Sequence, residues 1–543
     1  MKDLKTCIKG LWRHSKPVLW RDLVTVLIGT VRIATSLLFA WICKRLVDIV
    51  TGVSAADLWD HVWIMIGIML IQVVSALAYN WWCVYNITKT ENEMRHGFFS
   101  HVLGSRWNGR ETFKSGDTVN RLEADVDILA DLVCSRMPEV VITVVQLIAA
   151  SVFMLSMAPS LLWVLIILML TAVVGSKMYF LKIRQLTALI RSEDSDIQQL
   201  VQENLQNRVL VLTLFGVGNI VSRLGSIQDL LAKNVVKRLN YNAVARGFMS
   251  LGFMGGYAAA FLWGVFGIKD GTVTYGMMTA FLQLVGQVQR PIADLGRQIP
   301  AFINSITSVE RLLELEDLQT EKFHGNHMFP GAPGIRINDV TFAYSSDPAV
   351  LSHFSHDFKP GSLTVLAGPT GVGKSTLTRL MLGLLIPSGG TVELYSKDGE
   401  SHPADADTRC NFTYVPQGNS LLSGTIRENM LLANPSATEA EIIENLKLAS
   451  AEFVLDLPNG LDTVCGESGS GLSEGQCQRI AIARALLHPG GIMILDEATS
   501  ALDLETEERL LRSLHSSVSG SKTIVFISHR PAALAIADDV VNL

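Results

Sequence analysis

Proline is scarce in the first part of the chain, and its scarcity constrains the fold. Only five of the 17 prolines precede residue 301, and none lies between Pro159 and Pro291. Because proline interrupts helices, its absence favours long continuous helices over a loop-rich fold in this region. After residue 301 proline is more frequent, and the pattern is that of an ordinary α/β domain. The chain therefore divides into two parts of different character.

Cysteine pairs, histidine clusters and a positive net charge are also missing. The seven cysteines are scattered singly without a CxxC pair, and no histidines cluster at metal-ligand spacing. This pattern argues against a disulfide framework and predicts no zinc site. The formal net charge of −6 argues against nucleic acid as the main partner. The N-terminal stretch is too charged for a signal peptide and is expected to form a cytosolic surface helix.

Long apolar stretches are abundant in the first part. Of the 543 residues, 49% are hydrophobic, and the mean hydropathy of +0.32 is high for a soluble protein. Six stretches are each long enough to cross about 30 Å of hydrocarbon as a helix. They cover residues 22–43, 61–85, 138–157, 160–181, 247–268 and 276–299. We expect residues 1–317 to form a membrane domain of six long helices.

The distribution of Lys and Arg predicts how this domain is oriented. Six basic residues lie within the first 21, and residues 89–136 and 182–246 are rich in both types. The short connections at 51–57 and 157–160 contain none. Because basic connections stay in the cytosol, the N-terminus and the two long connections are predicted to be cytosolic. We expect a multi-pass protein of the plasma (inner) membrane.

The two long connections are predicted to extend helices far beyond the membrane. Residues 58–103 contain no proline, and one helix of that length would measure about 70 Å. Residues 160–214 give about 80 Å by the same arithmetic. Non-apolar breaks at 108–117 and 215–223 lie at the tips of these helices. Such rods are suited to carry motion from a soluble domain into the membrane.

Three polar residues within the predicted spans are candidate substrate contacts. Arg32 lies in the first span, and Gln283 and Gln287 share one face of the sixth. A charge inside a membrane suggests a cavity wall or a substrate contact, although pairing with a neighbouring helix explains Arg32 equally well. The glutamines suit either a polar pathway or interhelical hydrogen bonds.

A phosphate-binding motif stands in the second part of the chain. Residues 318–334 are rich in Gly, Pro and His and are predicted to be a linker, so that a new domain covers residues 335–543. Within it, an apolar strand at 363–367 enters the glycine-rich turn GPTGVGKS, and a helical pattern starts at Lys374. The amides of such a turn bind phosphate, while Lys374 reaches the outer phosphates and Ser375 ligates Mg²⁺.

Three further motifs support a nucleotide site. Tyr344, shortly before the phosphate motif, is placed to stack on adenine, and Gln417 follows a strand where its amide suits Mg²⁺ or the attacking water. The residues LSEGQ at 472–476 begin a helix and form a second phosphate site. This site cannot serve the same ATP as Lys374 unless two chains face each other.

Two acidic residues and a histidine supply the chemistry of hydrolysis. A buried apolar strand at 492–495 ends in Asp496 and Glu497. Asp496 is placed to hold Mg²⁺ through water, and Glu497 to orient or deprotonate the attacking water. His529 ends another strand and suits a contact with the γ-phosphate.

In this order, the motifs resemble those of an ATP-binding-cassette (ABC) transporter half-unit of the exporter type. The resemblance covers essentially the whole chain and implies a membrane α-helical domain followed by an α/β P-loop NTPase domain of the ABC ATPase type. It implies catalytic roles for Glu497 and His529 and metal contacts from Ser375, Gln417 and Asp496. The implied nucleotide-binding residues are Tyr344, Gly368, Thr370, Gly371, Val372, Gly373, Lys374, Ser375, Thr376, Gln417, Ser473, Gly475, Gln476 and Asp503.

The resemblance also implies partners and an activity. Two half-transporters, identical or different, would enclose two ATP molecules with Mg²⁺ between the phosphate motif of one chain and the 472–476 motif of the other. ATP hydrolysis in the cytosol would drive export of an amphipathic small molecule, lipid or peptide by alternating access. An importer with the same fold, and an ATP-gated channel or regulatory subunit, are the alternatives.

The sequence departs from the family pattern in two places. The family's LSGGQ reads LSEGQ here, with Glu474 in place of the first glycine. Ser473 and Gly475, the residues that contact phosphate in the family, are retained. Glu474 either points to solvent without effect or weakens closure on ATP. The sequence stops at Leu543, where the family usually continues through a further strand and helix.

Overall fold

The computed structural model describes residues 4–107, 115–344, 348–369, 371–466, 471–517 and 520–543. The chain forms two compact units. The first contains residues 1–102 and 116–317, and the second contains residues 103–115 and 318–543. Thr370, one of the predicted nucleotide contacts, lies outside the described residues, as does most of the predicted break at 108–117. Each unit is described below by itself.

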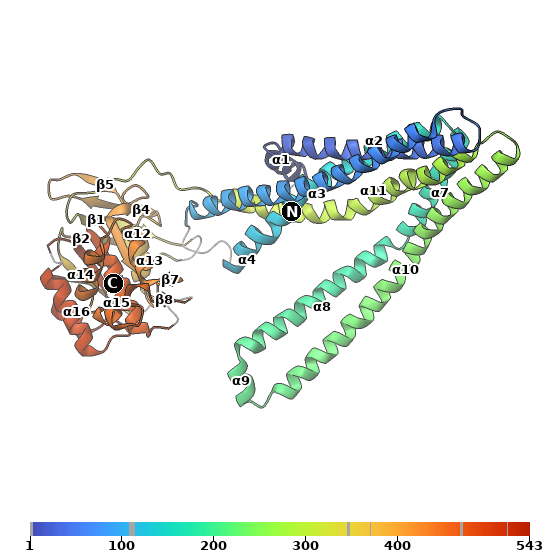
Figure 1. Cartoon of the computed structure of the whole chain (residues 1–543). Coiled ribbons are helices and arrows are strands. Elements are labelled where there is room, and N and C mark those ends of the chain that lie inside the picture. The colour runs from blue at the N-terminus through green and yellow to red at the C-terminus, as the bar shows by residue number, and fades with distance from the viewer. Residues whose placement is uncertain (1–3, 108–114, 345–347, 370, 467–470, 518–519) are drawn as a thin grey trace. The chain divides into compact units, whose positions relative to one another are not determined.

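The first unit is helical throughout (Figure 1). Its helices begin with α1 (Leu4–Ser15), α2 (Leu19–Val50) and α3 (Leu58–Leu103). A stretch interrupted by two π-helical turns follows as α4 (Ser115–Asn120), η1 (Arg121–Asp125), α5 (Val126–Asp131), η2 (Leu132–Arg136) and α6 (Met137–Leu155). The remaining helices are α7 (Pro159–Lys177), α8 (Phe180–Gln206), α9 (Arg208–Thr213), α10 (Val217–Lys269) and α11 (Tyr275–Glu316).

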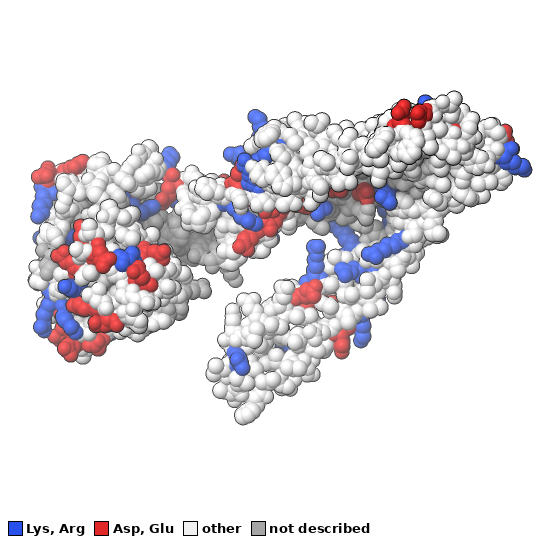
Figure 2. Space-filling model, in the orientation of Figure 1, with Lys and Arg blue, Asp and Glu red and all other residues white. Residues whose placement is uncertain are grey.

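The apolar helices agree with the predicted membrane spans. Five helices of the described chain are long and apolar enough to cross a membrane. They contain the first, second and fifth predicted spans, whereas the third and fourth predicted spans run past Leu155 and Lys177, where their helices end. The sixth, residues 276–299, lies in α11, which is not among those five. Gln283, Gln287, Gln289 and Arg290 lower the hydropathy of this segment. Figure 2 shows wide uncharged areas over the long helices, as a lipid-facing surface requires.

The prediction of long helices is confirmed for one connection and wrong for the other. The helix α3 runs unbroken over 46 residues, as the absence of proline indicated. The predicted helix over 160–214 is interrupted at residues 178–179 and at Asn207. The ring of Tyr179 packs beside Tyr241 and Phe248 of α10, so tertiary packing sets the first break. At the second, the Asn207 amide donates to the carbonyl of Glu203 and competes with the helical pattern.

The tip after α9 is also shorter than predicted. The predicted break covered 215–223, but residues 217–223 belong to α10. Only residues 214–216 leave the helical path, with Phe215 at a positive φ of 50°. Two glycines in the predicted break, Gly216 and Gly218, suggested a longer turn, yet Gly218 is accommodated within the helix. The tip exposes apolar side chains, and Phe215 is 94% exposed.

Small residues bring the membrane helices close together. A Cβ on Gly252 of α10 would lie 2.5 Å from the Cβ of Ala172 in α7. The amide of Gln289, in α11, donates to the carbonyl of Gly252, and Gly256 leaves the room this side chain needs. Nearer the tip, the buried Asn234 donates to Glu193 at 2.6 Å and joins α10 to α8. Glycines at helix interfaces with interhelical polar bonds are typical of membrane bundles.

The second unit is an α/β domain with two main sheets. An antiparallel sheet has the order β2-β1-β4-β5, and a parallel sheet has the order β11-β3-β10-β9-β6. The strands of the first sheet are β1 (Gly334–Phe342), β2 (Leu351–Phe358), β4 (Gly389–Tyr395) and β5 (Ser401–Pro403). Those of the second are β3 (Leu363–Ala367), β6 (Phe412–Val415), β9 (Ile492–Asp496), β10 (Thr523–Ile527) and β11 (Asp539–Asn542).

The helices of this unit cover the parallel sheet. Alternate residues of β9 face opposite cores, Ile492 and Ile494 one core and Met493 and Leu495 the other. The first core includes α12 (Lys374–Met381), and the second includes α13 (Ile426–Leu431), α14 (Glu439–Leu448), α15 (Glu474–Leu487) and α16 (Leu504–Ser517). The short elements are η3 (Arg409–Asn411), β7 (Gly424–Thr425), η4 (Glu452–Asp456), η5 (Gly460–Asp462), β8 (Val464–Cys465) and α17 (Pro531–Ala535).

Candidate functional site

The parallel sheet gathers the predicted nucleotide residues at one edge. Strands β3, β10, β9 and β6 are neighbours and run parallel, so their carboxyl ends lie together. The phosphate loop follows β3, and Gln417 follows β6. Asp496 is the last residue of β9, Glu497 comes directly after it, and His529 follows β10. Ligands of α/β proteins bind at this edge. The sequence places the motifs in four separate segments, and the sheet order brings them together.

The phosphate loop has the backbone that its glycines allow. Gly368, Gly371 and Gly373 have φ values of +143°, +90° and +114°, which favour glycine. Strand β3 delivers the chain from the core, and α12 begins at Lys374 directly after the last of these glycines. Ser375 is exposed and Val372 half-buried beside this turn. The helix N-terminus therefore presents its free amides at the loop, an arrangement suited to binding a phosphate.

The side chain of Lys374 lies at the centre of the site. It is only 8% exposed, and its Nζ donates to the carbonyls of Gly368 at 2.6 Å and Pro369 at 3.1 Å. The same Nζ lies 3.0 Å from Nε2 of His529. The two residues that the sequence assigned to the outer phosphates are thus brought into contact.

Asp496 and Glu497 differ sharply in their surroundings. Burial raises the pKa of Asp496, while the Tyr414 hydroxyl, donating to its Oδ2 at 3.1 Å, opposes that rise. Glu497 has a positive φ of 49°, a strained backbone for a residue with a side chain. Its N–H donates to the carbonyl of Ile527, and its Oε2 accepts from Nε2 of Gln417 at 2.6 Å. This contact joins the predicted base to the predicted water-binding amide.

Tyr344 lies beside the phosphate helix. Its hydroxyl is 3.1 Å from Oγ1 of Thr376 and accepts from Arg379 at 3.2 Å. The guanidinium of Arg379 also lies over the Trp107 ring, 4.7 Å from its centroid. Sequence reasoning missed Trp107, Arg379 and Tyr414, because no motif marks them. The one indication of Tyr414 in the sequence is its position, three residues before Gln417.

The 472–476 motif forms the start of α15, as its glycine pattern predicted. Ser473 caps the helix and exchanges hydrogen bonds with Gln476 in a capping box. Glu474 is exposed, in agreement with a side chain that points to solvent. A Cβ on Gly475 would lie 2.7 Å from the carbonyl oxygen of Ala501, so this glycine allows a close approach to the segment after β9.

The segment between β9 and α16 is held from several sides. Gln478 of α15 donates to Ser500 and accepts from the amide of Ala501. Asp503 caps α16 by accepting from the Thr506 amide at 3.0 Å, and this bond lowers the pKa of Asp503. The fully buried Glu507 binds Arg530, one residue after His529. Side-chain hydrogen bonds therefore connect α15 to the segment after β9, and the Glu507–Arg530 pair connects α16 to the segment after β10.

The membrane unit contains a large, partly open cavity with a mainly apolar lining. It has a volume of about 940 Å³ and lies among α2, α6, α10 and α11. Its walls combine apolar side chains with Gln146, Tyr257, Gln283, Gln287 and Arg290. Gln287 also donates to Ser36 at 2.7 Å, so it makes an interhelical hydrogen bond and lines the cavity at once. Arg32 is not among the lining residues.

Arg32 has a different place in the first unit. Its guanidinium lies over the ring of Tyr79, 4.9 Å from the centroid. Arg290 instead lines the cavity and has no ion-pair partner among the residues that the structure describes. The sequence singled out the first arginine because it interrupts an apolar run, and it missed the second because α11 is less apolar.

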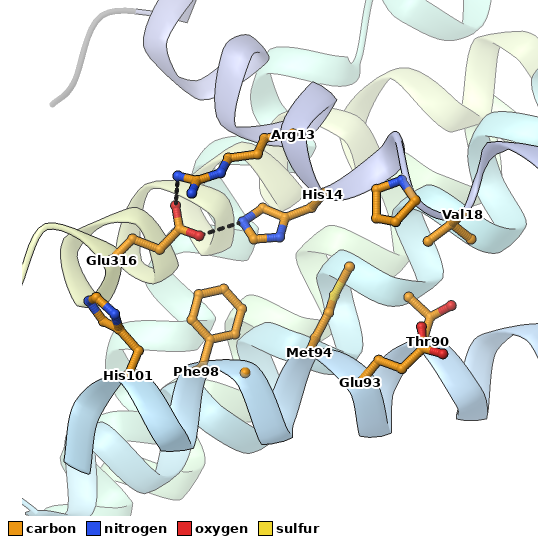
Figure 3. A pocket seen from close by; sticks show the side chains of 11 residues that line it. Arg13, His14, Val18, Thr90, Glu93, Met94, Phe98, His101 and Glu316 are labelled. Atoms are coloured by element: carbon orange, nitrogen blue, oxygen red, sulfur yellow. Dashed lines mark ion pairs between the residues drawn. The ribbon is translucent and has the colours of Figure 1, made fainter. Parts of the chain in front are cut away.

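A smaller cavity of about 350 Å³ lies between α1, α3 and α11 (Figure 3). His14 Nε2 lies 3.0 Å from a Glu316 oxygen, and Arg13 approaches the same carboxylate. The hydrogen bond from His14 is the main reason that the pKa of Glu316 is lowered. Phe98 and Met94 close the opposite wall. These contacts fasten α1 to the end of α11.

Comparison with known proteins decides the family. Residues 23–292 match the family described as the ABC transporter transmembrane region, and residues 351–500 match the family described as ABC transporter. The two matches together cover most of the chain, in the order that the motifs indicated. The chain belongs to the ABC transporter family. It is an ABC exporter half-transporter that hydrolyses ATP to drive transmembrane export.

Individual relatives of this ABC transporter differ in length. It is 26% identical to an uncharacterised ABC transporter ATP-binding protein, YfiC of Bacillus subtilis, over the whole chain and 90% of that protein. It is 30% identical to the ABC multidrug transporter mdr2 of Aspergillus fumigatus, over 79% of this chain and 54% of that one. Half of the chain is 37% identical to the alpha-hemolysin translocation ATP-binding protein HlyB of Escherichia coli and covers 39% of it.

A solved structure confirms the fold of the ABC transporter. A bacterial Atm1-family ABC exporter with ATP bound matches with a TM-score of 0.78. The match covers 97% of this chain and 94% of that one at 23% sequence identity. The prediction of a helical membrane domain followed by an ABC ATPase domain is confirmed.

Proposed function

We propose that two copies of this chain bind two ATP molecules between them and export an amphipathic compound by alternating access. The observation that carries the proposal is the completeness of one chain. Lys374, Glu497 and Gln417 are assembled at one edge of the sheet, and Ser473 and Gly475 are retained at the start of α15. One chain carries both the phosphate loop and the 472–476 motif. Two identical chains can therefore form both ATP sites, and no different partner chain is needed.

The roles in hydrolysis follow from the contacts. The amides of the phosphate loop and Lys374 hold the phosphates, and Ser375 and Asp496 are the residues that would hold Mg²⁺. A divalent ion would favour the ionised Asp496, whose pKa burial raises. Glu497, held by Gln417, takes a proton from the attacking water, while His529 contacts the γ-phosphate. Tyr344 is the adenine contact, and Asp503 acts by fixing the start of α16.

The exposed tip after α9 supports a paired assembly. Apolar side chains of this tip and of α9 itself are exposed in the single chain, with Leu214 at 70% and Phe215 at 94% in the tip and Val209 at 76% in α9. Exposed apolar clusters in a water-facing segment mark an interaction surface. We assign this tip to contact with the ATPase domain of the second copy. ATP-driven closure would then move α8 and α10, which are joined by Asn234 and Glu193.

The cavity favours one class of substrate. Its volume of about 940 Å³ suits a compound larger than a single amino acid. Several glutamines offer both donors and acceptors, and Arg290 supplies the only cationic group among the described lining residues. We propose an amphipathic substrate that carries an anionic group near hydrogen-bonding groups.

The Arg290→Ala variant tests this substrate class. Removing a charge-assisted contact of about 1.5–3 kcal/mol should raise the half-maximal concentration of anionic amphipathic stimulants roughly tenfold or more. The measurement is ATPase stimulation of the protein in lipid, with neutral analogues beside the anionic ones. Arg32→Ala is the comparison, because Arg32 lies over Tyr79 outside the cavity. Equal effects of both variants on anionic and neutral compounds would contradict the proposal.

Vesicles test direction and transport together. In proteoliposomes, external ATP reaches only the molecules whose ATPase domain faces outward. For these molecules, export delivers the compound into the lumen. We expect ATP-dependent uptake of the stimulating anion into such vesicles. ATP-dependent release of preloaded compound by these same molecules would instead identify an importer.

A further inference from the structure

Two histidines and a glutamate converge on the antiparallel sheet of the ATPase unit. His327 lies in the stretch before β1, while Glu400 and His402 lie at the β4–β5 hairpin. His327 Nε2 is 3.3 Å from Glu400 Oε1, and His402 Nε2 is 3.5 Å from the same oxygen. One ligand atom from each residue lies within 4.8 Å of those of the other two. None of the three takes part in the nucleotide site.

The distances from the two histidine Nε2 atoms to Glu400 Oε1 match the distances between neighbouring ligand atoms around a metal ion. Zn–N and Zn–O bonds of about 2.0–2.2 Å in tetrahedral geometry place neighbouring ligand atoms about 3.3–3.5 Å apart. The two Nε2–Oε1 separations, 3.3 Å and 3.5 Å, fall in that range. Two imidazoles and a carboxylate suit a divalent ion such as zinc, with a fourth position left for water.

The ring of His327 gives an independent indication. Its Nε2 atom is buried from solvent and has no hydrogen-bond partner within the described chain, although the Glu400 carboxylate is near. A buried polar atom without a partner is unfavourable unless a ligand satisfies it. The ring also packs at 81° against Phe329, which is 3% exposed, and this contact fixes its direction.

The rings of His327 and His402 lie against each other. Their centroids are 3.8 Å apart, and their planes are tilted by 34°. Phe329 packs against both rings, with centroid distances of 4.9 Å and 5.9 Å. This packing holds the two imidazoles together beside the Glu400 carboxylate, as two histidine ligands of one metal ion require.

The backbone holds the three residues in place before any ion binds. The N–H of His327 donates to the carbonyl of Asp407 at 2.8 Å, and its carbonyl accepts from Asn411 at 2.7 Å. The carbonyl of Glu400 accepts from the amide of Ser396 and closes the hairpin. Glu400 and His402 are two residues apart along an extended segment, so their side chains share one face.

We propose that His327, Glu400 and His402 form a binding site for a zinc-type divalent metal ion that clamps the 318–334 segment onto the β4–β5 hairpin. Sequence patterns predicted no zinc site, because the three ligands lie in two segments far apart in the chain. Only the pairing of β4 with β5, and the bonds of His327 to residues 407 and 411, bring them together.

Metal titration of the full chain tests the proposal. The chelator-treated protein in lipid nanodiscs, without nucleotide, is titrated with Co²⁺ and then with Zn²⁺ against a chromophoric chelator. We expect one Co²⁺ per chain with the visible absorption of a tetrahedral N/O site and no thiolate band, displaced by Zn²⁺. His327→Gln and His402→Gln should each weaken Zn²⁺ binding by roughly 100-fold or more, since losing even an outer-shell partner costs 10–100-fold.

Matched controls separate this site from other histidines. His324→Gln changes a histidine of the same segment, and His353→Gln changes another exposed histidine paired with an aspartate. Both should keep the wild-type affinity. Zn²⁺ should raise the unfolding temperature of the wild type and of both controls but not of the two ligand variants. Unchanged Zn²⁺ affinity in His327→Gln and His402→Gln, or no metal binding by the wild type, would overturn the proposal.

Discussion

Replacing Glu497 with Gln is expected to reduce ATP hydrolysis by about 10²–10⁴-fold, the usual contribution of a general base. ATP binding should remain, because the phosphates are held by the loop and Lys374. The side-chain carbonyl oxygen of the introduced glutamine can still accept a hydrogen bond from Gln417, as Glu497 Oε2 does at 2.6 Å. The measurement is ATPase rate together with nucleotide retained after rapid gel filtration.

The control for this variant is Glu508→Gln. Glu508 lies on the exposed face of α16 and pairs only with Arg512 among the described residues. Its substitution should leave both hydrolysis and nucleotide retention at wild-type values. A Glu497→Gln protein that hydrolyses ATP at the normal rate would show that another group acts as the base.

Lys374→Ala should abolish ATP hydrolysis at an earlier step than Glu497→Gln, because it should weaken ATP binding. The Lys374 ammonium contacts the phosphate loop, and charge-assisted hydrogen bonds to phosphate are among the strongest. We expect ATP affinity to fall by about 100-fold or more, with hydrolysis lost as a consequence. Binding of a fluorescent ATP analogue measures the change directly.

Lys397→Ala is the matched control for this second variant. Lys397 is exposed in the turn after β4, and its removal takes the same charge from the same domain. Normal ATP affinity in Lys374→Ala would contradict the assignment of the phosphate loop. Together, the Glu497 and Lys374 variants separate catalysis from binding, since only the second should lose the nucleotide.

Much of this site was predictable because its motifs are local. Short runs of residues form the phosphate loop, the carboxylate pair at the end of β9 and the helix cap at Ser473. Each run requires particular residue types at particular backbone conformations. The glycines with positive φ and the capping box at Ser473 follow directly from those runs. The helix α3 was predictable for a similar reason, because nothing in its 46 residues interrupts it.

The features that escaped prediction depend on tertiary contacts. Tyr414 contacts Asp496 only because β6 lies beside β9. The break at Tyr179 is set by the packing of its ring against α10, and a continuous helix was predicted there. The cavity position of Arg290 required the arrangement of four helices. In each case the residue is ordinary in its own segment, and its partner lies far along the chain.

The central claim is that each ATP is bound by the phosphate loop of one chain and the 472–476 motif of another. Two inactive variants, Lys374→Ala and Ser473→Arg, test it when they are expressed together and purified as a mixed assembly. Each mixed pair would contain one intact ATP site out of two. Random pairing makes half of all pairs mixed. If the sites act independently, the preparation should therefore regain about a quarter of wild-type ATPase activity. Activity no higher than that of either variant alone would contradict the account.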